Sequence, residues 1–196
     1  QIRTFWWALL WALVTLAVGR HTRLPRVHRG RDIMWWLDAA GILDETAEEV
    51  RDLAASRRQP SLQLVGQPGR TIDLPTLAGR GVRLAGKLAD VDRTRVSFAD
   101  DLAAHLAAAH ARLERVLQRI DIFAARTGLD AEVSPKERLL PFRSPPPPLG
   151  ELDLDRQGIR TVVWATGFRR LYPWLRVPAL DSHGEIVHRG GVTAHP

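Results

Sequence analysis

A long amphipathic pattern over residues 101–126 constrains the fold of this 196-residue chain more than any other feature. Its apolar positions alternate in steps of four and three, the spacing of one face of an α-helix. These positions are Leu102, Leu106, Ala109, Leu113, Val116, Ile120 and Phe123. Asp101 opens the pattern, where the helix dipole favours an anion, and Arg126 and Gly128 are C-terminal signals. The pattern predicts one long helix packed on a sheet, with a coiled coil as the alternative.

Residues 5–18 are almost continuously apolar and support two interpretations. A buried helix leading into a buried strand over residues 14–18 is favoured, because a bilayer-spanning helix needs about 20 apolar residues. The alternative is a membrane anchor, since residues 19–31 contain five arginines and basic flanks accompany such segments. No small-residue cleavage site follows the run, so the sequence does not indicate a signal peptide.

Shorter helices and a loop are predicted between the apolar run and residue 70. Asp32 can cap a helix over residues 33–40 that Gly41 ends. A second short helix is expected over residues 47–55. Residues 56–70 are polar and contain prolines and glycines, which indicates a loop.

Three segments have the composition of β-strands. Two strands are expected near residues 82–89 and 95–98, joined by a turn at residues 90–93. Residues 158–167, "GIRTVVWATG", have the apolar, β-branched composition of a buried strand. A hairpin turning at residues 182–184 is predicted closer to the C-terminus.

Prolines at residues 145–148 form a stiff, extended run between two parts of the chain. The chain has no cysteine, so disulfides and thiolate metal sites are excluded, and a reducing, cytoplasmic setting is expected. His105 and His110 are five residues apart on the predicted helix and cannot hold a metal together, and no metal site is expected. No G-x-G-x-x-G, no G-x-x-x-x-G-K-[ST] and no G-x-S-x-G occurs, so the chain contains no recognisable phosphate loop or hydrolase elbow.

The positive charge of the chain is carried almost entirely by arginine. The formal net charge is +6, and the only lysines are Lys87 and Lys136. Arginine suits phosphate and carboxylate recognition because its planar fork binds them with two parallel hydrogen bonds. Nucleic acid is not expected as a partner, because residues 19–31 lack interleaved aromatic side chains and any reader motif.

The stretch Ala165-Thr166-Gly167-Phe168 resembles the ATG motif of flavin-containing monooxygenases and related flavoproteins with two dinucleotide-binding domains. Other segments resemble the same group in the same order. They are "VTLAVGRHTRLPR", "GRDIMWWLDAAGILDE", "GVRLAGKLADVDRTRVSFADDL" and "LDSHGEIVHRGGVTAHP". The resemblance covers about residues 14–196.

The resemblance implies an α/β fold that is incomplete at both ends. Residues 1–144 would form a partial Rossmann-like NAD(P)H-binding domain, and residues 145–196 would form a connector and part of an FAD-binding domain. The function implied is that of a flavin-dependent NAD(P)H oxidoreductase or monooxygenase with a small organic substrate. The fingerprint glycines for both cofactors are missing, so the chain is expected to be an internal fragment that is inactive alone. The alternative is a membrane-anchored interaction protein that inserts residues 5–18.

The resemblance also implies four cofactor-binding residues. Arg20 ends the second strand of the NADPH domain, where an arginine accommodates the 2′-phosphate of NADP, and Arg23 lies beside it. Thr166 offers a hydroxyl, and Gly167 allows the backbone to approach the FAD or NADP closely. A solvated basic loop at Arg20 and an ordinary strand-ending turn at Gly167 are the simpler alternatives. No catalytic residue, substrate identity or oligomeric state is indicated.

Overall fold

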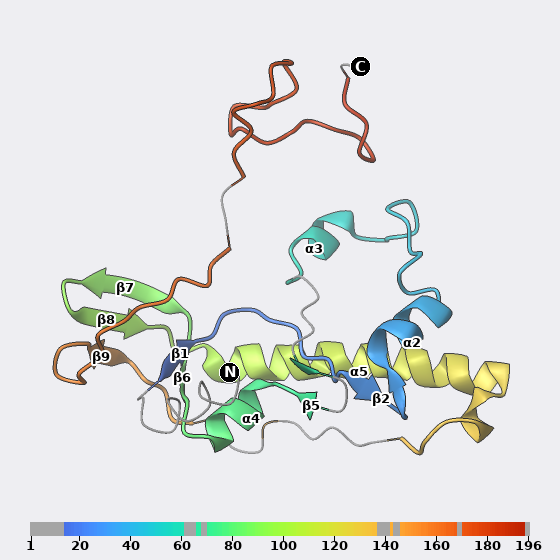
Figure 1. Cartoon of the computed structure of the whole chain (residues 1–196), viewed down its shortest axis with the longest axis horizontal. Helices are drawn as coiled ribbons and strands as arrows, with labels where there is room; N and C mark the ends of the chain where they lie inside the picture. Colours follow the sequence, from blue (N-terminus) through green and yellow to red (C-terminus); the bar gives the residue numbers. More distant parts are fainter. Residues whose placement is uncertain are drawn as a thin grey trace, which may run out of the picture. The chain divides into compact units, whose positions relative to one another are not determined.

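The computed structural model describes residues 14–60, 66–67, 70–136, 142, 146–167 and 170–194, with the backbone alone at 57, 66–67 and 70–71. The chain divides into two compact units, Gln1–Ile159 and Arg160–Pro196, and each is described by itself. The described strands form small sheets and are combined with a few helices, so the chain has a mixed α/β structure. Figure 1 shows these elements along the chain.

The long helix α5 (Leu102–Thr127) is the framework of the first unit, as the apolar spacing predicts (Figure 1). It begins after Asp101 and ends at Gly128, which adopts the left-handed conformation with φ 76°. Its buried residues recur on one face: Leu102, Leu106, Ala109, Leu113, Leu117, Ile120 and Ala124. A short 3₁₀ helix, η2 (Leu129–Ala131), follows the helix end.

The first half of α5 packs on a pair of parallel strands. β1 (Thr15–Ala17) pairs with β6 (Arg83–Ala85), with Leu16 opposite Leu84. Leu84 is buried in one cluster with Leu102 and Leu106 of the helix, and Val18 joins the cluster just after β1. The predicted strand over residues 14–18 and the predicted packing of the long helix on a sheet are therefore confirmed.

The second half of α5 packs on a different element, the helix α2 (Ile33–Ala39). Asp32 caps α2 by accepting a hydrogen bond from Met34 N at 2.9 Å, and Gly41 follows with φ 65°. The predicted helix over residues 33–40 is thus confirmed. The hairpin of β2 (Val27–His28) and β3 (Arg31–Asp32) leads directly into it.

The predicted strand over residues 82–89 is in fact two strands with different partners. β6 pairs with β1, whereas β7 (Leu88–Asp92) pairs with β8 (Arg95–Phe98) in an antiparallel sheet that β9 (Glu151–Asp153) completes. The chain changes partner at Gly86, where it passes close to the backbone of Ala99. The turn lies at residues 93–94, later than predicted, with Arg93 at φ 52°.

Two predictions between residues 47 and 70 are wrong. The helix is α3 (Leu53–Arg57), because Asp52 caps it there by accepting from Ala55 N at 2.8 Å. Glu49 instead closes a turn by accepting from Thr46 N at 2.8 Å. The predicted loop contains the hairpin of β4 (Gly66–Gln67) and β5 (Arg70–Thr71), and the helix α4 (Leu74–Gly79) follows it.

The segment after Ile159 is not the buried strand that its composition predicts. Residues 159–167 form no strand, and Val163 and Trp164 are 81% and 66% exposed. An extended apolar segment becomes a strand only when a neighbouring strand satisfies its backbone, and no described residue pairs with this one. The hairpin at residues 182–184 is confirmed, because Leu180 pairs with Ile186 across the turn.

The predicted division of the chain lies between residues 144 and 145, whereas the boundary between the two compact units lies between Ile159 and Arg160. The difference arises from β9, which follows the prolines but belongs to the sheet of β7 and β8. Prolines 146–148 lie in irregular structure, and residue 145 lies outside the described residues.

Gly86→Ala tests the close approach that lets the chain change from β6 to β7. A methyl group at this position would meet Ala99 O and Asp101 Oδ1, so we expect a loss of about 1–3 kcal/mol in the free energy of unfolding. Gly79→Ala is the matched control, because a methyl group there meets no described atom within 4 Å, and it should be neutral or slightly stabilising. Urea unfolding of both variants measures the difference, and equal effects would contradict the close approach.

Candidate functional site

Arg20 lies just beyond the carboxyl end of β1, where the resemblance places it. Val18 N still donates to Ala85 O at 3.0 Å, and the chain leaves the strand pair at Gly19. The Arg20 side chain is exposed and forms no ion pair or hydrogen bond within the described part of the chain. Ligands of open α/β sheets bind at the carboxyl ends of parallel strands, and Arg20 follows such an end.

Arg23 is committed to contacts within the protein. Its Nη2 lies 3.3 Å from Asp73 Oδ2, and its Nη1 lies 3.3 Å from His110 Nδ1. Its side chain is only 17% exposed. These contacts tie the connection between β1 and β2 to the start of α4 and the middle of α5. The guanidinium of Arg23 is therefore used within the protein, whereas that of Arg20 has no ion pair or hydrogen bond among the described residues.

His21 and Arg112, which the sequence analysis did not single out, complete this part of the surface. Arg112 Nη2 donates to His21 O at 2.7 Å, and His21 Nδ1 donates to Gly19 O at 3.1 Å. We call Arg20, His21 and Arg112 the β1 edge. Arg112 has no signal in the sequence, because its place here comes from a contact with a residue 91 positions away.

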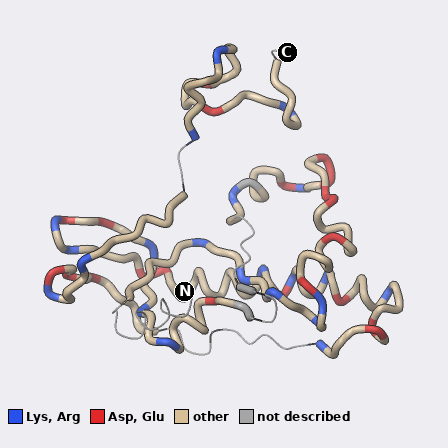
Figure 2. The backbone as a smooth tube through the Cα atoms, viewed as in Figure 1, with Lys and Arg blue, Asp and Glu red and all other residues tan. Residues whose placement is uncertain are grey.

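Positive charge is concentrated at the β1 edge. Burial lowers the pKa of His21, and the nearby charges of Arg112, His105 and Arg23 lower it further against the effect of its bond to Gly19. Burial also lowers the pKa of Arg112, with smaller effects from the guanidinium groups of Arg115 and Arg20. Figure 2 shows that the connection between β1 and β2 carries basic residues and no acidic ones.

Thr166 and Gly167 belong to the second unit, whereas Arg20 and Arg23 belong to the first. Thr166 and Gly167 are both exposed, and Gly167 has φ 87°. A methyl group on Gly167 would meet no described atom within 4 Å. The structure therefore explains this glycine by its left-handed backbone, which side chains rarely adopt.

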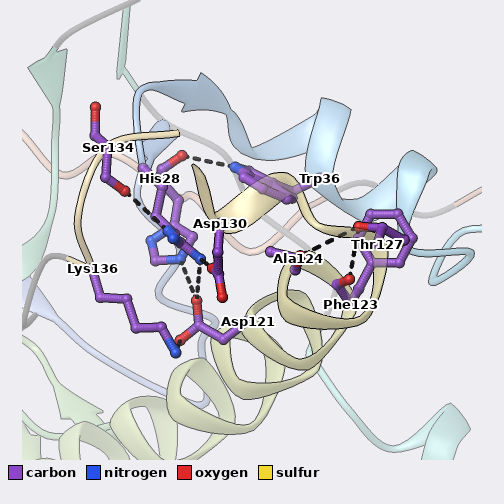
Figure 3. Close-up of polar contacts among 10 residues, drawn as sticks. His28, Trp36, Asp121, Phe123, Ala124, Thr127, Asp130, Ser134 and Lys136 are labelled. Atoms are coloured by element: carbon purple, nitrogen blue, oxygen red, sulfur yellow. Dashed lines mark hydrogen bonds and ion pairs between the residues drawn. The ribbon is translucent and has the colours of Figure 1, made fainter. Parts of the chain in front are cut away.

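A second polar cluster fixes the β2–β3 turn to the end of α5 (Figure 3). Arg29 is 4% exposed and has φ 50°, an uncommon conformation for a residue with a side chain. Its Nη1 lies 2.6 Å from Asp130 Oδ1 and 3.5 Å from Asp121 Oδ1, and its Nε donates to Ser134 O at 3.0 Å. A buried guanidinium needs such partners. Separation of the turn from the helix would therefore leave the charge of Arg29 without them.

Asp121 is the acceptor at the centre of this cluster. Its Oδ1 also lies 3.5 Å from His28 Nε2, and its Oδ2 lies 3.3 Å from Lys136 Nζ (Figure 3). His28 is buried, and its carbonyl oxygen accepts from Trp36 Nε1 at 2.7 Å. Because the side chains of Arg29 and His28 are buried, we interpret this cluster as stabilising the fold. The sequence does not show whether a single aspartate on a long helix is solvated or paired with buried cations. The sequence therefore does not predict this cluster.

The described residues offer neither a metal site nor a membrane-spanning helix. No group of three or more His, Asp or Glu residues there is arranged to hold a metal ion. No helix in the described ranges is long and apolar enough to cross a membrane, and residues 15–17 of the predicted anchor form β1. Residues 5–13 of that anchor lie outside the described residues.

Comparison with protein-family models, curated proteins and solved structures finds no match.

Asp121→Asn tests whether the buried cluster holds the turn. The substitution removes one of the two anionic partners of the buried Arg29, so we expect a loss of about 1–3 kcal/mol in the free energy of unfolding. Glu132→Gln is the control, because Glu132 is 66% exposed and 3.8 Å from Arg31, and its loss should cost about 0–1 kcal/mol. Chemical denaturation compares them, and a similar small cost for both would show that the cluster is dispensable.

Gly167→Ala separates the two explanations of this glycine. The positive φ predicts a cost of about 1 kcal/mol, whereas Gly150→Ala should cost less because residue 150 has an ordinary φ and open space around it. Chemical denaturation of both variants measures the two costs. An equal effect of the two substitutions would contradict the left-handed conformation.

Proposed function

We propose that this chain contributes NADP-binding strands to a flavin-dependent oxidoreductase or monooxygenase that acts on a small organic substrate. The observation that carries the proposal is the free guanidinium of Arg20 just past the carboxyl end of a parallel strand. This is the position where Rossmann-type domains meet the adenosine ribose, and an arginine there accommodates a 2′-phosphate.

The fold of the first unit supports the proposal. Parallel strands require a crossover connection, and the chain between β1 and β6 includes α2, α3 and α4. The helix α5 then covers the strand pair with Leu102 and Leu106. We propose that β1 and β6 are part of a Rossmann-like sheet, of which the described residues contain these two strands.

The flavin part of the proposal depends on the resemblance of residues 165–168 to the ATG motif. FAD would supply the electron transfer from NADPH to oxygen and substrate. Of the family's FAD contacts, the chain offers Thr166 and the left-handed turn at Gly167. The exposed apolar residues before them, Val162, Val163 and Trp164, are consistent with a strand that is covered in a larger assembly.

Arg20→Ala tests the proposal directly. The variant should bind NADPH more weakly by about 1.5–3 kcal/mol, because it loses a charge-assisted hydrogen bond, and NADH binding should hardly change. Calorimetric titration of this chain, or of a longer protein that contains it, with both cofactors measures the difference. Arg119→Ala is the matched control, since Arg119 lies exposed on α5 without an ion pair or side-chain hydrogen bond among the described residues. Equal weakening of NADPH and NADH, or no binding of either, would contradict the proposed function.

A further inference from the structure

Arg112 has more hydrogen-bonding capacity than the protein uses. Its bond from Nη2 to His21 O is the one hydrogen bond it forms within the described part of the chain, and it has no ion pair there. Its Nε is buried and has no partner among the described residues. A guanidinium carries five N–H donors, so most donors of Arg112 remain uncommitted.

The acidic residues of this region do not neutralise the β1 edge. None of them forms an ion pair with Arg20 or Arg112: Asp73 pairs with Arg23 at 3.3 Å, while Asp101 and Glu114 lie 3.1 Å and 3.3 Å from ring nitrogens of His105 and His110. Arg20 and Arg112 thus form no ion pair among the described residues, and Arg112 is hydrogen-bonded to the residue that follows Arg20. Like charges held together raise the energy of the unliganded protein, and an anion between them would remove that cost.

We infer that Arg112 and Arg20 together form a binding site for a phosphate monoester dianion at the carboxyl end of β1. The bond from Arg112 Nη2 to His21 O holds one guanidinium beside the residue that follows Arg20. Two arginines from different elements, the β1–β2 connection and α5, then bind one anion from two directions. This inference rests on the proposed function for Arg20 and adds Arg112 as the residue that positions and binds the phosphate.

The chemistry favours a compact dianion over other anions. A phosphate monoester carries nearly two negative charges at neutral pH and three acceptor oxygens, which match two guanidinium forks better than a single carboxylate does. The source of the phosphate is either the 2′-phosphate of NADP or free inorganic phosphate, and both have this chemistry. A nucleic acid backbone is a poorer match, since its diesters carry one charge each and the surrounding segment lacks aromatic side chains for bases.

The test is an NMR titration of the whole chain at pH 7.5 with inorganic phosphate, adenosine 2′-phosphate and adenosine at constant ionic strength. We expect amide shifts at residues 19–21 and near residue 112 with both phosphates and none with adenosine. Bound phosphate should also raise the pKa of His21, because its charge opposes the lowering by Arg112, His105 and Arg23. Tighter binding of adenosine 2′-phosphate than of inorganic phosphate would identify the nucleotide as the source, and equal binding would identify the free anion.

Variants at Arg112 decide whether this residue binds the anion. Arg112→Gln should weaken phosphate binding by about tenfold or more, Arg112→Lys should restore part of it, and Arg119→Gln should leave it unchanged. The circular dichroism spectrum of each variant shows whether it is folded, and the lysine variant carries the test if the glutamine variant is not. Phosphate binding that is unaffected by either Arg112 variant, or shifts confined to other residues, would overturn the inference.

The two proposals fail in different ways. If phosphate binding depends on Arg112 while NADPH binds no better than NADH, the anion site is supported and the proposed function is wrong. If NADPH is preferred through Arg20 while Arg112→Gln leaves the affinity for NADPH and phosphate unchanged, the inference is wrong and the proposed function stands.

Discussion

The apolar stripe of α5 is the interaction on which the rest of the first unit depends. Its first turns bury Leu102 and Leu106 against the parallel pair of β1 and β6, and its later turns bury Leu113, Leu117 and Ile120 against α2. Burial of each such side chain contributes about 1.5–3 kcal/mol, which is more than an exposed ion pair contributes. Without the apolar stripe of α5, neither the pair of β1 and β6 nor the helix α2 would bury a core. One long helix therefore contributes to two cores that follow one another along its axis.

This arrangement determines where the β1 edge lies. The connection from β1 to β2 must run from the first core to the second along the middle of α5 (Figure 1). Leu24 of the connection enters the second core, and Arg23 contacts His110 on the helix. His21 consequently lies against Arg112, beside the exposed Arg20. The buried cluster around Arg29 and Asp121 fastens the far end of this connection, so the position of the edge is maintained from both sides.

Features that depend on local physics could be predicted from the sequence, and features that depend on pairing could not. The long helix, the helix capped by Asp32 and the hairpin at residues 182–184 follow from apolar spacing, caps and turn residues. Residues 158–167 have strand composition, but no described strand satisfies their backbone. Residues 82–89 have the continuous composition of one strand, but their pairing partner changes from β1 to β8 within this segment. For the site, Arg20 could be found from its place after a strand, whereas Arg112 acts through a contact with a residue 91 positions away.

Under the proposed function, the carboxyl end of β1 recognises the phosphate that distinguishes NADP from NAD. Hydrogen–deuterium exchange of the chain with saturating NADPH and with NADH tests it most directly, because exchange reports where a ligand protects the backbone. We expect protection of residues 18–23 and of the middle of α5 with NADPH, and clearly weaker protection of the same segments with NADH. Equal protection by the two cofactors, or protection that leaves residues 18–23 unchanged, would contradict it.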